Sequence, residues 1–337
     1  MTDNKLLDKF FVYLENNPLP SRRRAGASPT TIKGYVQDIS VFLRWWKQSF
    51  GNELTIPLLR KDPYQLNKKT VQDFLVWLEI TMKYRAATIL RYAASLRAFS
   101  TFLNAAQAIK HDPTIGLRLP VKKKEDPKGL DDTQRARFEA VFQTPWLDKV
   151  TKRKRTYETL APQRLVRDRA IAFLMLYAGP RVEETSSLDL DDIEIYPRSG
   201  EMHIRKGKNA KERDVPLPKP ARDALTAWLK VRSTFPIKHK ALFVDLRKYE
   251  RLSMRSMQLI VAEAGQRAGL DRQAPPVFVT PHILRHTWLY MLRQKEVSAE
   301  IRAALAGHSL ETTMKYGSPK RPEIERAVKA LDDAVTI

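Results

Sequence analysis

Residues 281–287 read PHILRHT and combine a helix-starting proline with two histidines and an arginine. Proline is favoured in the first turn of a helix, so the stretch predicts a helix that begins at Pro281. His282 and Arg285 are three residues apart, and side chains at that spacing leave the same face of a helix. The two side chains can therefore grip one small anion together.

Two further motifs extend this constellation in both directions along the chain. Downstream, Gly307-His308 is followed by Tyr316, which lets a histidine and a tyrosine approach the same place across a short turn. Upstream, Arg181 is followed at Glu184 by a carboxylate, one helical turn beyond the guanidinium. The sequence therefore offers two arginines, two histidines and a tyrosine as candidates for one anion-binding pocket.

These residue types suit the cleavage of a phosphodiester by a protein hydroxyl. That reaction needs a nucleophile, donors for the equatorial oxygens of the phosphorane, and an acid for the departing oxygen. Arginine suits the nonbridging oxygens because its guanidinium stays charged and donates in a fixed plane. Lysine suits the leaving oxygen because it can lose its proton. Residues 207–213 read GKNAKER and predict a hairpin turn, which with Lys206 offers three lysines, Lys206, Lys208 and Lys211.

In this order and with these gaps, the motifs resemble the tyrosine recombinases and integrases, and the resemblance covers nearly the whole chain. Pro180 and Ala306 depart from it, because leucine is common in the family at both positions. The resemblance implies that a tyrosine forms a 3′-phosphotyrosyl bond and releases a 5′-hydroxyl, which later attacks the equivalent bond of a partner strand through a Holliday junction, without ATP, metal or another cofactor. It implies these roles: Tyr316 is the nucleophile, Arg181 and Arg285 clamp the nonbridging oxygens, His282 assists removal of the tyrosine proton, His308 hydrogen-bonds the phosphate, Lys208 protonates the leaving oxygen, and Glu184 orients Arg181 or its neighbours.

Other interpretations of the same residues exist. Taken singly, the histidines are more often ordinary hydrogen-bonded side chains, and Arg181 with Glu184 is more often an ion pair on a helix surface. A type IB topoisomerase shares the nucleophile and the clamp, and a catalytically silent DNA-binding relative shares the fold. His282 and His286 have the spacing of zinc ligands, but no glutamate follows His282 as in a zincin helix, so no metal site is expected.

The composition points to a polyanionic partner. The chain has 60 Lys and Arg against 38 Asp and Glu, a net charge of +22, which favours nucleic acid or an anionic membrane surface. No run of about 18 apolar residues predicts a membrane span, so we expect a cytoplasmic, nucleoid-associated protein that does not act at a membrane. The absence of cysteine excludes disulfides, thiolate catalysis and cysteine-based zinc sites.

The predicted fold is mainly helical with one small antiparallel sheet. Residues 1–112 are expected to form a helical bundle, in which apolar residues recur at helical spacing in 3–15, 32–46 and 89–103, and Thr70-Val71-Gln72-Asp73 resembles a capping box. Residues 113–128 predict a basic linker. Residues 129–337 predict an α+β domain with helices near 131–142 and 166–178, β-like runs at 193–196, 203–205 and 213–215, and a C-terminal tail helix.

The resemblance also implies the partners. It makes the bundle a SAM-like core-binding domain that forms a clamp around double-stranded DNA together with the catalytic domain. It implies specific recombination sites, a homo-tetramer on DNA, possible accessory proteins, and a role in the integration of a mobile element, although excision and resolution stay open. The tail, residues 322–333, is expected to pack either on a neighbouring protomer or on its own domain. The candidate DNA contacts are Lys33, Arg85, Thr88, Arg91, Lys122 and Lys123.

Overall fold

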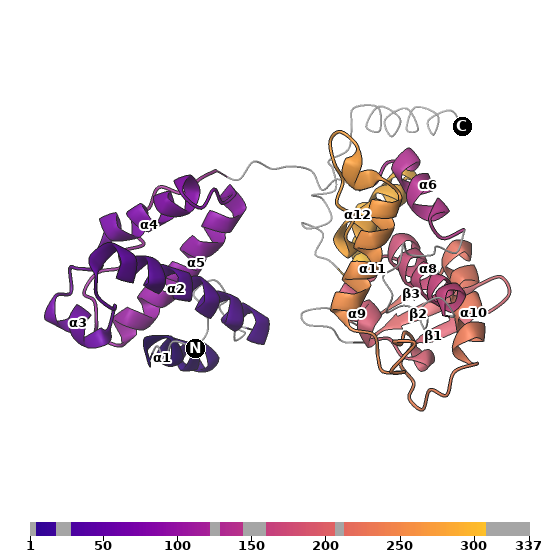
Figure 1. Cartoon of the computed structure of the whole chain (residues 1–337), viewed down its shortest axis with the longest axis horizontal. Helices are drawn as coiled ribbons and strands as arrows, with labels where there is room; N and C mark the ends of the chain where they lie inside the picture. The colour runs from indigo at the N-terminus through magenta and orange to yellow at the C-terminus, as the bar shows by residue number, and fades with distance from the viewer. Residues whose placement is uncertain (1–4, 18–27, 122–128, 144–159, 206–211, 308–337) are drawn as a thin grey trace, which may run out of the picture. The chain divides into compact units, whose positions relative to one another are not determined.

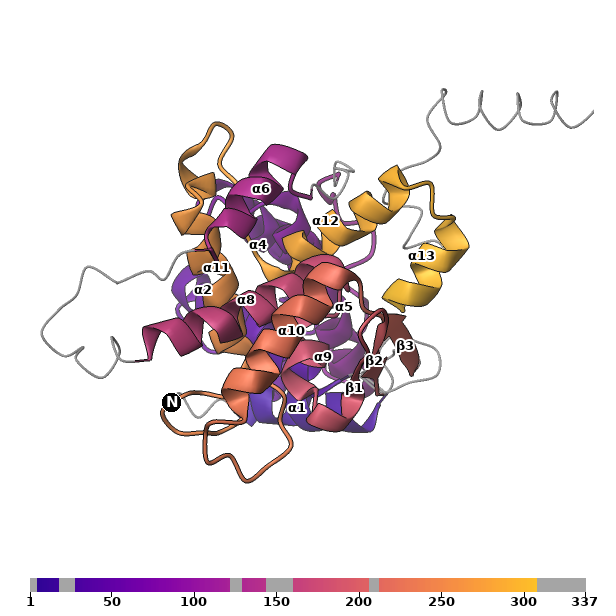
Figure 2. The same cartoon turned by 90° about the vertical axis from the view of Figure 1, so that its right-hand side faces the viewer.

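The computed structural model of the chain describes residues 5–17, 28–121, 129–143, 160–205 and 212–307. The chain divides into two compact units, Met1–Lys124 and Glu125–Ile337, and the division falls inside the predicted linker, residues 113–128. The first unit is helical, whereas the second combines helices with a small sheet (Figures 1 and 2). The predicted fold class is confirmed. None of the described helices is long and apolar enough to cross a membrane.

The N-terminal unit is a bundle built on aromatic side chains. Phe42, Phe74 and Phe99 are fully buried. The rings of Phe74 and Phe99 pack edge-to-face against the ring of Phe42, with centroid distances of 5.0 and 6.5 Å. The aromatic stripes of the sequence are therefore core. The helices of this unit are α1 (Lys5–Asn16), α2 (Pro29–Phe50), α3 (Ile56–Lys61), α4 (Lys68–Ile80) and α5 (Ala86–Ala105).

Two local signals in this unit had different outcomes. Ser28 caps α2 as its spacing predicts, because its side chain accepts a hydrogen bond from the Thr31 amide at 3.1 Å. The capping box at Thr70 is wrong, since α4 begins two residues earlier and its cap is Asn67, which accepts from the Thr70 amide at 3.1 Å. Thr70 is itself buried in the helix, and Asn67 is an equally good cap.

The C-terminal unit is organised around one buried helix, α8 (Ala161–Tyr177). Residues 170–176 of this helix are apolar on every side and almost completely buried, as expected for a helix that neighbours cover all round. α10 and α12 pack against α8. The other helices of the unit are α6 (Asp132–Ala140), α9 (Val182–Ser187), α10 (Lys219–Arg232), α11 (Met254–Arg267), α12 (Pro281–Gln294) and α13 (Ala299–Ala306).

A three-stranded antiparallel sheet lies in the same unit, in the order β1-β2-β3. Its strands are β1 (Ile193–Ile195), β2 (Gly200–Ile204) and β3 (Arg213–Pro216). The predicted start of β2 at His203 is wrong, because the strand already pairs at Gly200, opposite Ile195. Ile204 and Arg213 are partners in the register between β2 and β3, so these two residues form the base of the predicted hairpin.

Candidate active site

The structure describes only part of the predicted pocket. Arg181, Glu184, His282 and Arg285 lie in the described part of the C-terminal unit. Lys33, Arg85, Thr88 and Arg91 lie in the described part of the N-terminal unit. Five other predicted site residues lie outside the described residues, namely Lys208, His308, Tyr316, Lys122 and Lys123, and so does the tail, residues 322–333.

A sharp turn between α8 and α9 places Arg181. Gly179 has a φ of +65°, a left-handed conformation that favours glycine. A Cβ at this position would stand 2.0 Å from Cε3 of Trp288, so no larger residue fits without a shift. Pro180 follows, and Arg181 is the extended N-cap residue of α9, with a φ of −69° and a ψ of 155°. The turn therefore fixes the direction in which the Arg181 side chain leaves the backbone.

Glu184 is held by two arginines. Its side chain is 5% exposed and accepts from both the backbone N and the Nη1 of Arg181, each at 2.7 Å. It also accepts from Nη2 of Arg213 at 2.9 Å and from Nη1 of Arg213 at 3.2 Å. Burial alone would raise the pKa of Glu184, but hydrogen bonds and the positive charge of both arginines lower it to about 2. Glu184 is therefore ionised at every ordinary pH.

Arg285 joins the ends of two helices that are distant in sequence. It lies on α12 with only 3% of its surface exposed. Its Nη1 donates to the carbonyl oxygen of Gly179, and its Nη2 donates to that of Ala306. Gly179 immediately precedes the turn that carries Arg181, and Ala306 ends α13. Arg285 therefore fixes both segments relative to α12.

The end of α13 collects three arginines. The carbonyls of the last helical turn have no partner within the helix and carry its partial negative charge. Here Leu305 O accepts from Nε of Arg213 at 2.9 Å, Ala306 O accepts from Arg285, and Gly307 O accepts from Nη2 of Arg181 at 3.2 Å. Three successive carbonyls thus bind three guanidiniums from β3, α12 and the α8–α9 turn, directly before His308 in the chain.

Arg213 also belongs to this arrangement, although its sequence context predicts no role for it. It is the first residue of β3 and its side chain is 8% exposed. The sequence contains a weak signal, since an arginine opens the strand that follows the predicted hairpin. A single arginine at a strand end is common, however, and nothing near it in the sequence identifies Glu184 or Leu305 as its partners.

His282 lies in the first turn of α12, which begins at Pro281 and is capped by Thr280. Its side chain is exposed, whereas Arg285 one turn later is buried. The ring of His282 stacks on that of His286, with centroids 6.4 Å apart. Burial, together with the neighbouring His282 and Arg285, lowers the pKa of His286 to about 4. His286 is therefore neutral near pH 7, and His282 is the histidine of this helix that faces solvent.

The predicted DNA contacts of the N-terminal unit occupy two helices. Lys33 on α2 and Arg85 at the N-cap of α5 are exposed, and Thr88 is half-buried. Arg91 is exposed but is not a freely solvated cation, because its Nη1 donates to the carboxylate of Asp38 on α2. Asp38 is 1% exposed and also accepts from Oγ of Ser95 at 2.7 Å. The buried carboxylate therefore ties Arg91 to one orientation.

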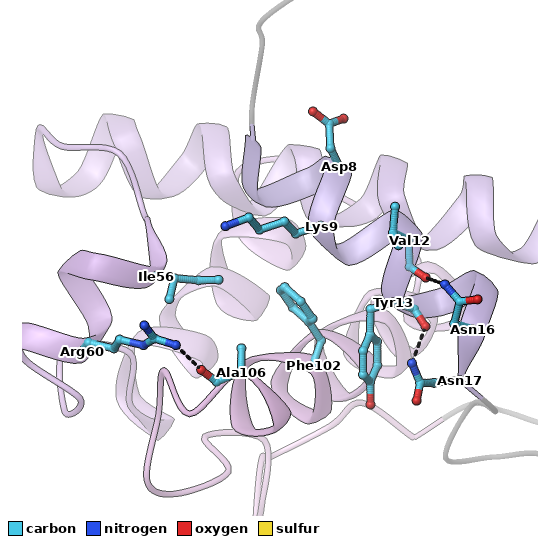
Figure 3. Close-up of a pocket in the computed structure, with 10 residues that line it drawn as sticks. All are labelled: Asp8, Lys9, Val12, Tyr13, Asn16, Asn17, Ile56, Arg60, Phe102 and Ala106. Atoms are coloured by element: carbon cyan, nitrogen blue, oxygen red, sulfur yellow. Dashed lines mark hydrogen bonds between the residues drawn. The ribbon is translucent and has the colours of Figure 1, made fainter.

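A pocket of about 640 Å³ lies within the N-terminal unit, between α1, α3 and α5 (Figure 3). Val12, Tyr13 and Phe102 give it an apolar wall, and Arg60 at its edge donates to the carbonyl of Ala106 at 2.8 Å. None of the predicted site residues lines it. Among the described residues of the chain, no three His, Asp or Glu side chains group in a way that would hold a metal ion.

The chain is similar to known proteins over most of its length. Residues 152–321 match the phage integrase family, and residues 14–105 match the N-terminal SAM-like domain of phage integrases. The chain is 33% identical to the tyrosine recombinase XerC of Vibrio vulnificus (strain YJ016) over 322 residues, 93% of this chain and 86% of that protein. It is 34% identical to XerC of Haemophilus influenzae (strain PittEE) over 226 residues, 66% of this chain and 67% of that protein.

Solved structures show the same fold at lower identity. The Tn1549 transposon integrase in complex with a circular intermediate DNA matches with a TM-score of 0.68 and 16% identity, over 97% of this chain and 99% of that one. The XerH site-specific recombinase bound to a palindromic difH substrate matches with a TM-score of 0.61 and 17% identity, over 97% and 94% of the two chains.

Proposed function

This chain belongs to the phage integrase family of tyrosine recombinases, and we propose that Tyr316 is the nucleophile with which it cleaves and rejoins DNA. It is a site-specific recombinase, so the reaction conserves the energy of the broken bond. The Tyr316 oxygen attacks the scissile phosphorus, a P–O bond to tyrosine forms, and the bond to the 5′ oxygen breaks. The departing oxygen takes a proton, and the resulting 5′-hydroxyl of one strand later attacks the phosphotyrosyl bond of another.

The observation that carries this proposal is the convergence of arginines at the end of α13. Arg181 and Arg285 come from motifs 104 positions apart in the chain, yet both donate to successive carbonyls directly before His308. Donors that are held in place before the substrate arrives need no reorganisation as charge develops on the phosphorane. In our proposal these two guanidiniums clamp the nonbridging oxygens, and His308 adds a hydrogen bond to the same phosphate.

Proton transfer is assigned to the remaining candidates. His282 is exposed at the start of α12, one helical turn from Arg285, where it can assist removal of the Tyr316 proton. Lys208 follows β2 in the chain and precedes Arg213, and we assign it the protonation of the leaving 5′ oxygen. Glu184 orients Arg181 through the two hydrogen bonds between them.

DNA is the proposed partner of both units. Residues 1–112 would contact DNA through Lys33, Arg85, Thr88 and Arg91, residues 113–128 through Lys122 and Lys123, and residues 129–337 would hold the scissile phosphate, so that the chain acts as a clamp on DNA at the nucleoid. The net charge of +22 supports this arrangement. Each neutralised phosphate should contribute about −0.9 to the log–log slope of affinity against salt. Lys33→Ala should therefore make the slope shallower by roughly this amount.

Strand exchange between two duplexes needs four active sites, so we propose a homo-tetramer that assembles on DNA with specific recombination sites. Residues 322–333 carry Ile324, Val328 and Leu331 at helical spacing and are the proposed connector between protomers. Leu331→Asp should then weaken assembly on DNA, measured by sedimentation of the protein–DNA complex. Unchanged assembly would mean that this segment packs on its own domain.

The decisive test is a suicide-substrate assay. Purified protein is incubated, in the presence of EDTA, with a nicked duplex that carries the DNA sequence flanking the gene of this protein. The products are then separated on a denaturing gel. A covalent adduct that is absent with Tyr316→Phe supports phosphotyrosyl chemistry without a metal. Transfer of the strand to a second duplex separates recombination from the relaxation of supercoils by a topoisomerase. If DNA is bound but wild-type protein forms no adduct, the assignment of Tyr316 is wrong.

A further inference from the structure

Arg213 is the buried arginine of the candidate site that the proposed reaction does not yet use. All three of its guanidinium nitrogens are engaged with the protein: Nε with Leu305 O at 2.9 Å, Nη1 with Oε1 of Glu184 at 3.2 Å, and Nη2 with Oε2 of Glu184 at 2.9 Å. Its side chain is 8% exposed. Every nitrogen of Arg213 is thus directed at a protein acceptor, and the route from Arg213 to the reaction runs through those partners, Glu184 and Leu305.

The charge balance around Glu184 suggests what that effect is. Arg181 alone with the ionised Glu184 would be a neutral pair, and its positive charge would be offset where the phosphate binds. Arg213 supplies a second positive charge to the same carboxylate, so the three side chains together carry a net charge of +1. The carboxylate is only 5% exposed, so solvent screens little of its negative charge and the compensation comes from the arginines.

The geometry gives Arg213 a second effect on the same pocket. Its bond to Leu305 O is adjacent to the carbonyls of Ala306 and Gly307 that hold Arg285 and Arg181. Gly307 packs against it so closely that a Cβ there would stand 2.9 Å from Nη1 of Arg213. One planar side chain thus joins β3, Glu184 and the last turn of α13, an arrangement that the single nitrogen of lysine cannot reproduce.

We propose that Arg213 is a positioning residue with two effects. It compensates the negative charge of Glu184, so that Glu184 does not offset the positive charge of Arg181 at the scissile phosphate. It also fixes the last turn of α13 beside that phosphate. The inference rests on the proposed function, because it assigns Arg213 to the same phosphate clamp. It predicts that loss of Arg213 slows cleavage more on a negatively charged scissile phosphate than on an uncharged analogue.

The test compares two suicide substrates, one with an ordinary scissile phosphate and one with an uncharged methylphosphonate at that position. Arg213→Met removes the charge at similar length, and we expect adduct formation on the phosphate to slow on the order of tenfold to a hundredfold. On the methylphosphonate the same variant should lose much less relative to wild type, because little negative charge has to be stabilised. Equal slowing on both substrates, or no slowing on either, would overturn the proposal.

Arg213→Lys separates charge from geometry and provides a second variant if Arg213→Met does not fold. Lysine keeps the positive charge but cannot bridge Leu305 O and both carboxylate oxygens, so its rate on phosphate should lie between those of wild type and Arg213→Met. A lysine variant that folds, as judged by circular dichroism, and is as slow as Arg213→Met would overturn the charge argument. DNA affinity in a gel-shift titration should stay unchanged for both variants, because Arg213 is buried.

Arg205→Met is the matched control. Arg205 follows β2 in the same hairpin and binds the carboxylates of Asp192 and Asp189 at 2.6 and 3.0 Å, away from Glu184. Its variant should show the wild-type ratio between the two substrates. Failure of the proposed function looks different, since wild-type protein itself would then form no adduct that depends on Tyr316. If wild-type protein cleaves and the Arg213 variants behave like Arg205→Met, only the role of Arg213 is refuted and the proposed function stands.

Discussion

Gly179 lies against the indole of Trp288, so closely that a Cβ on Gly179 would stand 2.0 Å from Cε3. The same glycine has a φ of +65°, and its carbonyl oxygen accepts a hydrogen bond from Arg285. The α8–α9 turn, the core of α12 and one arginine of the proposed clamp therefore meet at a residue without a side chain. Any side chain at this position would displace at least one of them.

We expect Gly179→Ala to destabilise the C-terminal unit by about 2–5 kcal/mol, the sum of backbone strain and overpacking. Hydrogen exchange of α8 and α12 in the full chain measures this loss. Gly51→Ala is the control, because Gly51 has a φ of +72° but nothing within 4 Å of its Cβ position. It should cost only the strain of about 1 kcal/mol in its own unit. Equal effects of the two substitutions would show that the contact with Trp288 is unimportant.

Glu184→Gln should harm both stability and catalysis. The substitution leaves Arg181 and Arg213 facing each other without the anion between them, and removal of one partner from a buried ion pair costs about 3–5 kcal/mol. Hydrogen exchange of α9 and β3 should report this loss, and adduct formation on the suicide substrate should slow as well. Glu183→Gln is the control on the preceding residue, where no described ion pair is broken, and it should leave both measurements unchanged.

His286 should make the C-terminal unit sensitive to acid. The unfolded chain binds a proton at His286 with a pKa near 6.5, whereas the folded chain binds it only near 4. Protonation below pH 6.5 therefore favours the unfolded state, and stability should fall by up to about 3 kcal/mol as the pH drops from 6.5 to 4. Urea denaturation of wild type and His286→Gln over this range measures the difference, and the variant should lose less stability on acidification.

His203 provides the control for this pH dependence. Hydrogen bonds to Asp214 and Glu212 raise its pKa in the folded chain, opposite in direction to His286. Its stabilising effect is complete below pH 6.5 and is lost only as the pH rises through the raised pKa. His203→Gln should therefore keep the wild-type fall in stability between pH 6.5 and 4. If His286→Gln behaves like His203→Gln, burial of His286 does not govern the acid response.

Asp38 and Arg91 should be energetically coupled across α2 and α5. Asp38 is buried, and burial raises its pKa against the hydrogen bonds from Ser95 and Arg91 that lower it. A double-mutant cycle with Asp38→Ala and Arg91→Ala should give a coupling free energy of about 1–3 kcal/mol from hydrogen exchange of α2 and α5. The exposed pair Lys69 and Asp73, four residues apart on α4, should give only about 0.3–0.5 kcal/mol. A coupling equally small for Asp38 and Arg91 would contradict a fixed orientation of Arg91.

Local sequence signals were sufficient for most of the secondary structure. Each of these signals involves residues within about one helical turn of each other, so it can be recognised in the sequence. Examples are Ser28 before Pro29, the apolar spacing from Ile89 to Leu103, and Pro281. The same rules failed at Thr70, because Asn67 offers the backbone a competing cap three residues earlier. The pairing of Arg181 with Glu184 was accessible for the same local reason, since the two residues are three positions apart.

The contacts that assemble the candidate site join residues too distant in the chain for any spacing rule. Arg213 reaches Glu184 and Leu305, and Arg285 reaches Gly179 and Ala306, because α8, α12, α13 and the sheet pack into one unit. Sequence periodicity shows the face of a helix from which a side chain leaves, and residue chemistry shows the kind of ligand it suits. Which carbonyl or carboxylate it contacts depends on the packing of the whole unit. For this reason the partners of Arg213 can be identified only in the folded chain.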